Sequence, residues 1–187
     1  DFVKVQVNIL KFEAKNHLTS NRAEEIISFI SHDIKDLSVK LTALCHISPL
    51  FYSENIEIAD FDIFEQKKSI FQSLISSIGD QLPSIKEPLL TEVEYSLETA
   101  FHWANQLNTR RRIDQACSMI IRKACLINKV GNIDDIHKRI NRIKDKRAYE
   151  DSIISLLNYC IELDEITKSD IRKVTKLVKK TRNSIVL

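Results

Sequence analysis

The near absence of glycine and proline is the feature that most limits what this chain can fold into. Its 187 residues include only two glycines and three prolines. Tight turns between strands rely on Gly, Pro, Asn and Asp, so a sheet-rich fold would be short of turn residues. Long helices joined by short polar loops need few of either. The sequence therefore predicts an all-α protein.

Apolar residues recur with helical periodicity along most of the chain. The clearest stripe predicts one helix that is capped within Thr19-Ser20-Asn21, where Asn21 and Glu24 resemble a capping box, and that stops at Pro49. Its apolar residues are Ile26, Ile30, Ile34, Leu37, Leu41 and Leu44. Residues 48–59 are expected to form a loop. Val3, Val5 and Val7 alternate as in a strand, but a helix is preferred for 2–17 because an isolated strand has no partner.

Further helices are expected over 60–81, 88–108, 109–130, 132–143 and 148–163, and from 167 or 169 onward. Pro88 fits a first helical turn, and Gly131 fits a left-handed helix end. These segments predict an irregular bundle of about six to eight helices, or alternatively a short stack of helical hairpins. The chain is expected to be a single domain, 1–187, and a piece of a longer protein because it lacks an initiator methionine. No apolar run approaches the length of a membrane span.

The small net charge of +2 hides a strong asymmetry between the two halves of the chain. Residues 1–100 hold nine Lys and Arg against sixteen Asp and Glu, whereas residues 101–187 hold nineteen against ten. Such polarity indicates either an acidic partner for the second half or head-to-tail docking of like chains.

The basic residues of the second half gather in three stretches. They are Arg110, Arg111 and Arg112; Lys138, Arg139, Arg142, Lys146 and Arg147; and Arg172, Lys173, Lys176, Lys179 and Lys180. In the last helix the cations lie opposite an apolar arc. Helix faces of one sign favour an acidic protein surface, a phosphate backbone or anionic lipid as partner. Aromatic residues are scarce among the last fifty residues, which argues against base stacking on single strands.

These patterns favour a non-enzymatic interaction or scaffold module that binds an acidic or helical protein partner through its basic second half. The alternative is nucleic-acid binding by the same residues, expected to be weak and non-specific. No phosphate loop, nucleophile elbow or dinucleotide fingerprint occurs, so neither catalysis nor a cofactor is expected. A metal site on Glu94, Glu98 and His102 is disfavoured because no facing helix is rich in carboxylates.

A third hypothesis concerns His32. The segment from Ser31 to Leu37 resembles the phosphoacceptor box of sensor histidine kinases, in which an exposed helical histidine is followed by an acid, an aliphatic residue and a base. The resemblance covers seven residues, and Asp36 and Leu37 stand where Thr or Asn and then Pro are usual. It implies a His-Asp phosphotransfer module that uses His32.

The four cysteines are expected to be buried free thiols in a reducing, intracellular compartment, either cytoplasmic or nuclear. Each lies among apolar neighbours, and no two form a CxxC pair. Cys117 and Cys125 are eight residues apart on one predicted helix, roughly 12 Å along its axis, which is too far for a disulfide. A disulfide framework or a zinc site is the alternative.

Overall fold

The computed structural model describes Asn8, Phe12, 19–53, Ile56, Ile58, 61–79, 81–163 and 167–183, with side chains up to Lys179. These residues form nine α-helices and one π-helical turn, and none of them lies in a strand. The prediction of an all-α fold is confirmed. The helix predicted for 2–17 lies outside the described residues, apart from Asn8 and Phe12.

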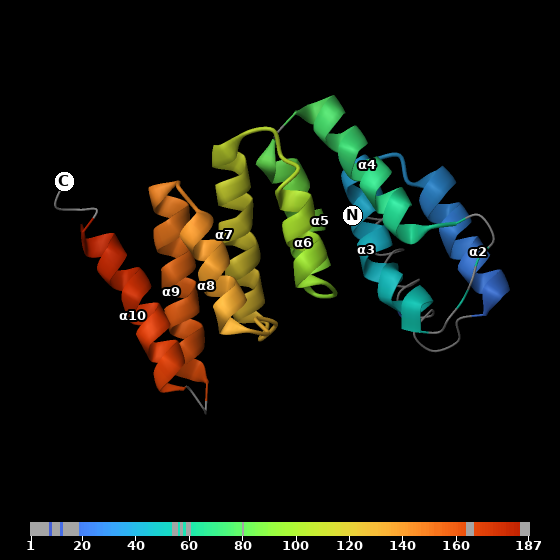
Figure 1. Ribbon diagram of the computed structural model, residues 1–187. Coiled ribbons are helices and arrows are strands. Elements are labelled where there is room, and N and C mark those ends of the chain that lie inside the picture. Colours follow the sequence, from blue (N-terminus) through green and yellow to red (C-terminus); the bar gives the residue numbers. More distant parts are fainter. Residues whose placement is uncertain are drawn as a thin grey trace. The chain divides into compact units, whose positions relative to one another are not determined.

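The chain forms two compact units, 1–95 and 96–187 (Figure 1). The first unit contains α2 (Ser20–Ser28), η1 (Phe29–Asp33), α3 (Leu37–Ser53), α4 (Ile63–Ile78) and α5 (Leu82–Val93). The second contains α6 (Leu97–Ala104), α7 (Arg110–Leu126), α8 (Ile133–Arg142), α9 (Lys146–Glu162) and α10 (Lys168–Asn183). That the chain acts as one domain stays a prediction, as does the choice between a bundle and stacked hairpins.

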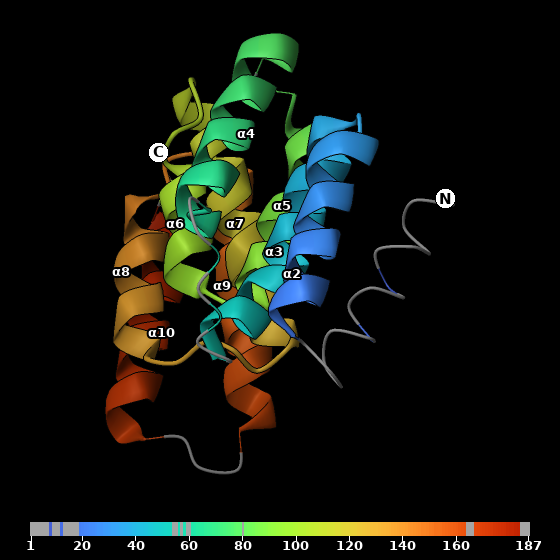
Figure 2. The same ribbon diagram turned by 90° about the vertical axis from the view of Figure 1, so that its right-hand side faces the viewer.

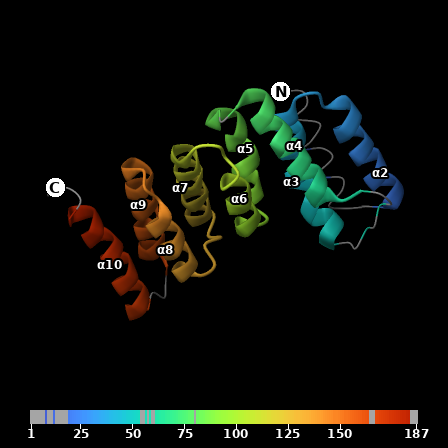
Figure 3. The same cartoon turned by 45° about the horizontal axis from the view of Figure 1, so that its top comes forward.

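In the first unit α3 is the central helix, with α4 and α5 packed against it (Figures 2 and 3). Much of the core comes from α2, η1 and α3, whose apolar stripes face one another. Its buried residues are Ala23, Ile26, Ile30, Ile34, Ala43, Leu44, Ile47, Phe51 and Ile63. The apolar stripe from Ile26 to Leu44 is therefore a core face, as the periodicity indicates.

The single helix predicted across this stripe is wrong, because the chain leaves the helical conformation at Ile34 (φ −80°, ψ 110°). The carboxylate of Asp36 then accepts hydrogen bonds from the backbone N–H groups of Ser38 at 2.8 Å and Val39 at 3.0 Å. Satisfying the first N–H groups in this way is what an N-cap residue does. Asp36 therefore starts a second helix, α3, within the stripe.

The predicted stop at Pro49 is also wrong, since α3 continues to Ser53 with the proline inside it. Proline removes one helical hydrogen bond and normally bends or ends a helix. Here Ile47 and Phe51 on either side of it are buried, so side-chain packing holds the last turn in place. Residues 48–53 of the predicted loop are therefore helical.

The helix predicted for 88–108 is two helices. Pro83 occupies the first turn of α5, and Pro88 lies inside that helix rather than at its start. The chain turns after Val93, and the Ser96 hydroxyl accepts a hydrogen bond from the Thr99 N–H at 3.2 Å. That cap begins α6.

In the second unit α7 and α9 run in the same direction, and α8 and α10 run opposite to them (Figure 1). α7 packs chiefly on α9, while α10 packs on α8 and α9. The core residues lie on the facing sides of these four helices. They include Ala116, Ile120, Ile121, Ala124, Ile136, Ile140, Leu156, Val174 and Leu177.

Gly131 does not end α7 as predicted, because the helix already stops at Leu126. The Lys129 N–H donates to the Ala124 carbonyl at 2.8 Å, and Asn128 between them takes the left-handed conformation (φ 56°). Asparagine tolerates that conformation better than most residues. Gly131 is left-handed too, but it precedes Asn132, the cap of α8.

Candidate partner-binding surface

A buried carboxylate joins the start of α7 to the junction between α8 and α9. Asp114, with a side chain only 2% exposed, accepts hydrogen bonds from the N–H groups of Lys144 at 2.8 Å and Asp145 at 2.9 Å. Arg110 Nη2 lies 3.0 Å from the same carboxylate and also donates to the Arg142 carbonyl. A buried charge is tolerated when it is paired and hydrogen-bonded in this way.

The Asp114 contacts bring together two of the three basic stretches found in the sequence. Besides Arg110, five exposed cations lie here, which we call the basic junction: Arg111, Arg142, Lys144, Lys146 and Arg147. Among the residues that the structure describes, Arg111 alone of these five forms an ion pair, with its Nε 4.0 Å from Asp145 Oδ2. The junction thus collects positive charge from segments thirty residues apart.

Three other predicted site residues are engaged within the protein. The Arg139 guanidinium lies over the Phe101 ring, 4.0 Å from its centroid. Lys138 Nζ is 3.2 Å from Asp135 Oδ1, and Arg112 donates to Gln115 Oε1 at 3.4 Å. These contacts compete with any external partner.

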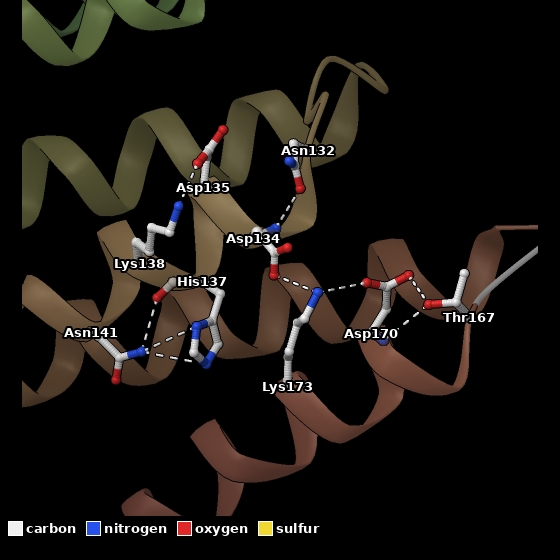
Figure 4. Close-up of polar contacts among 9 residues, drawn as sticks. All are labelled: Asn132, Asp134, Asp135, His137, Lys138, Asn141, Thr167, Asp170 and Lys173. Carbon is white, nitrogen blue, oxygen red and sulfur yellow. Dashed lines mark hydrogen bonds and ion pairs between the residues drawn. The ribbon is translucent and has the colours of Figure 1, made fainter.

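Lys173 is an internal clamp rather than a member of an open basic face (Figure 4). Its side chain is only 26% exposed, and its ammonium pairs with Asp134 of α8 and, at 3.5 Å, with Asp170. The hydrogen bond to Asp134 raises the pKa of Lys173, and the Thr167 hydroxyl lowers the pKa of Asp170. Lys173 therefore ties α10 to α8.

Three further cations of α10 are exposed to solvent. They are Arg172, Lys176 and Lys179, which lie four and three residues apart, and we call them the basic rail. The side chain of Lys180 lies outside the described residues. The rail is thus the part of the third predicted stretch that faces solvent.

An apolar groove of about 440 Å³ lies between α9 and α10. Its lining residues are mostly aliphatic: Leu157, Cys160, Ile161, Leu163, Ile171, Val174, Thr175 and Val178. Ile161 is 79% exposed and Ile171 49% exposed, so the groove opens to the surface. The sequence predicts an apolar arc on α10 opposite its cations, but this groove was not predicted. The available signal was a second apolar stripe on α9, at Ile154, Leu157 and Ile161.

The first unit holds a buried ion pair that the sequence analysis also missed. Lys67 Nζ lies 3.2 Å and 3.0 Å from the two carboxylate oxygens of Glu92, and the Cys45 thiol donates to the same carboxylate at 3.0 Å. All three side chains are buried. The signal was a lysine within the stripe of Ile63 and Phe71.

The residues of the phosphotransfer and metal hypotheses lie in the first unit and at the start of the second. His32 is exposed in η1, with its Nδ1 3.0 Å from the Ser28 carbonyl, and the helix ends just after it. Glu94 follows α5, whereas Glu98 and His102 lie on α6. Among the residues that the structure describes, no three His, Cys, Asp or Glu side chains gather as metal ligands would.

All four cysteines are free and buried, as predicted. Burial raises the pKa of Cys117 to about 11 and that of Cys125 to about 12. It also raises the pKa of Cys45 well above its usual range, with a further contribution from Glu92. Because the thiolate is the nucleophile, we expect these buried thiols to react slowly at neutral pH.

We therefore expect Ellman's reagent to react with less than one thiol within minutes in the native protein, and with four after unfolding in guanidinium without reductant. Two missing thiols after unfolding would instead reveal a disulfide. Stability should also fall with rising pH above roughly 8.5, where unfolded cysteines ionise. The folded thiols keep their protons up to higher pH, so ionisation favours the unfolded chain.

No family model, curated protein or solved structure matches this chain. None of the described helices is both long enough and apolar enough to cross a bilayer.

Proposed function

We propose that this chain is a non-enzymatic, intracellular interaction module whose second unit binds an acidic protein partner. The proposal rests on how acidic and basic side chains differ within that unit. Asp114, Asp134 and Asp170 form ion pairs inside the unit. By contrast, several exposed cations form no ion pair with any described residue: Arg142, Lys146, Arg147, Arg172, Lys176 and Lys179. The buried free thiols support the intracellular assignment.

A protein partner is favoured over nucleic acid by the exposed aliphatic side chains of the same unit. Ile161 is 79% exposed and Ile154 is 55% exposed, and Ile171 opens onto the groove. Large exposed apolar groups mark surfaces that bind other proteins, whereas a phosphate backbone offers them nothing. The cations then supply charge complementarity and faster association.

The proposal predicts the charge of binders selected from a displayed library of random 16-residue peptides. Peptides recovered on the full chain at physiological salt should be net acidic. Three cations are replaced by glutamate in one variant of the rail (Arg172, Lys176, Lys179) and in one variant of the junction (Arg142, Lys146, Arg147). Either variant should bind the peptides at least tenfold more weakly, because attraction becomes repulsion. Fluorescence anisotropy of labelled peptides measures the affinities.

A matched control reverses three surface lysines of the acidic first unit: Lys35 and Lys86, which are exposed, and Lys68, which is half-buried. It changes the net charge equally and should alter affinity less than twofold. Neutral or basic binders, or acidic binders insensitive to both reversals of the second unit, would contradict the proposed function.

The same titration with a labelled 20-base-pair duplex separates the nucleic-acid alternative. For each phosphate contact that a protein makes, its affinity for the duplex falls by nearly one log unit per log unit of salt. We expect weak duplex binding near 50 mM salt that disappears by roughly 200 mM. Tight duplex binding at physiological salt would replace the protein partner with nucleic acid.

A further inference from the structure

We infer that the groove between α9 and α10 seats an amphipathic helix of the acidic partner, with the acidic side of that helix facing the basic rail. This inference rests on the proposed function and assigns it to one place. The basic junction then contributes long-range attraction without direct contact.

The size of the groove suits a helix that inserts a few apolar side chains. A cavity of roughly 150 Å³ accepts a benzene-sized group, so about 440 Å³ holds two or three large aliphatic side chains. The rail spans from Arg172 to Lys179, roughly two helical turns or 10 Å along the axis. Apolar anchors at positions i, i+3 or i+4, and i+7 of a helix cover the same length.

The charges around the groove determine the rotation of the bound partner helix about its own axis. Each cation of the basic rail directly follows a residue that lines the groove. These lining residues are Ile171, Thr175 and Val178. Since successive helical residues are about 100° apart, the rail runs along the outer rim of α10.

The opposite rim, on α9, has a different character. It exposes Ile154 and Ile161, with the acids Asp151 and Glu162 exposed beyond them. An acidic side facing α9 would meet like charges, which are destabilising. The acidic side of the bound helix therefore faces α10.

A helix fits this surface better than an extended peptide does. Strand addition needs an exposed sheet edge, and the described part of the chain contains no strand. Two packed helices with an apolar furrow between them present the ridges and grooves into which a third helix packs.

The test uses the acidic peptides recovered on the full chain. Bound peptides should gain helical circular dichroism, and their sequences should show apolar residues spaced three or four apart beside a run of Glu or Asp. Ile161→Asp should weaken binding at least tenfold. Leu126→Asp is the matched control, since Leu126 is equally exposed on the same unit but does not line the groove; it should change affinity less than twofold.

Thr175→Trp provides a second, independent variant. Thr175 is exposed at the wall of the groove, so a tryptophan there fills the groove without removing a core side chain. We expect at least a tenfold loss of peptide affinity, with the native circular dichroism spectrum and the unfolding midpoint retained.

Other outcomes would overturn the inference and identify what failed. Suppose that the junction variant lowers the affinity for acidic peptides but that Ile161→Asp and Thr175→Trp do not. The binding site would then lie outside the groove, and the proposed function would still hold. Failure to recover acidic peptides would overturn both. A tenfold gain in peptide affinity on deleting 184–187 would assign the groove to the chain's own end. A doubled mass by light scattering that Ile161→Asp abolishes would assign it to a second copy of the chain.

Discussion

Lys67→Met should lower the free energy of unfolding by about 3–5 kcal/mol, because it leaves the Glu92 carboxylate buried without its partner. Lys67 donates to both carboxylate oxygens of Glu92, and the Cys45 thiol is the remaining donor. A weak thiol hydrogen bond does not offset the burial of a charge. Guanidinium unfolding followed by circular dichroism measures the loss.

The neighbouring lysine is the control. Lys68 pairs with Glu65 at the surface, with side chains 37% and 58% exposed, so Lys68→Met should cost at most about 1 kcal/mol. Replacing both members of the buried pair, Lys67→Met with Glu92→Met, should recover most of the stability lost in either single variant. Additive losses in the double variant would show that the pair is not coupled.

Asp114→Ala should cost about 3 kcal/mol, because it removes one acceptor from three donors at once. The N–H groups of Lys144 and Asp145 would lose their partner, and Arg110 would lose its ion pair. Hydrogen exchange at these two amides should accelerate more than exchange in α10. The same denaturant titration measures the loss of stability.

Two variants bracket this effect. Asp114→Asn keeps one acceptor oxygen without the charge, so its cost should be intermediate. Asp135→Ala removes a surface partner of Lys138 and should change stability by less than about 0.5 kcal/mol. Equal exchange rates at Lys144 and Asp145 in the Asp114→Ala variant and the parent would contradict the structural role of Asp114.

The helices of the second unit follow from local sequence signals more closely than those of the first. α8 and α9 lie where capping residues and apolar periodicity coincide, at Asn132 and at Asp145. In the first unit Asp36 interrupts a stripe whose apolar spacing continues unbroken, so periodicity hides the cap. Pro49 and Pro88 sit inside helices because tertiary packing overrides their local preference.

The cationic and apolar residues of the candidate surface could be predicted from the sequence, but their contacts and exposure could not. The sequence identifies the cations of α10, yet the partners of Lys173 lie on two helices, and Asp134 is remote in sequence. Whether a cation of α10 forms an internal ion pair, as Lys173 does, or stays exposed in the basic rail depends on how the helices pack. In the same way, Ile171 and Ile161 belong to regular apolar stripes, and their exposure depends on how closely α9 and α10 approach.

The boundary between the two units at Tyr95 and Ser96 nearly coincides with the change in charge. The first unit holds nine Lys and Arg against fifteen Asp and Glu, and the second holds nineteen against eleven. Opposite charges on two compact bodies of one chain attract the complementary bodies of other chains when the Debye length is long. We therefore expect the second virial coefficient to be lowest at low ionic strength and to rise when salt is added.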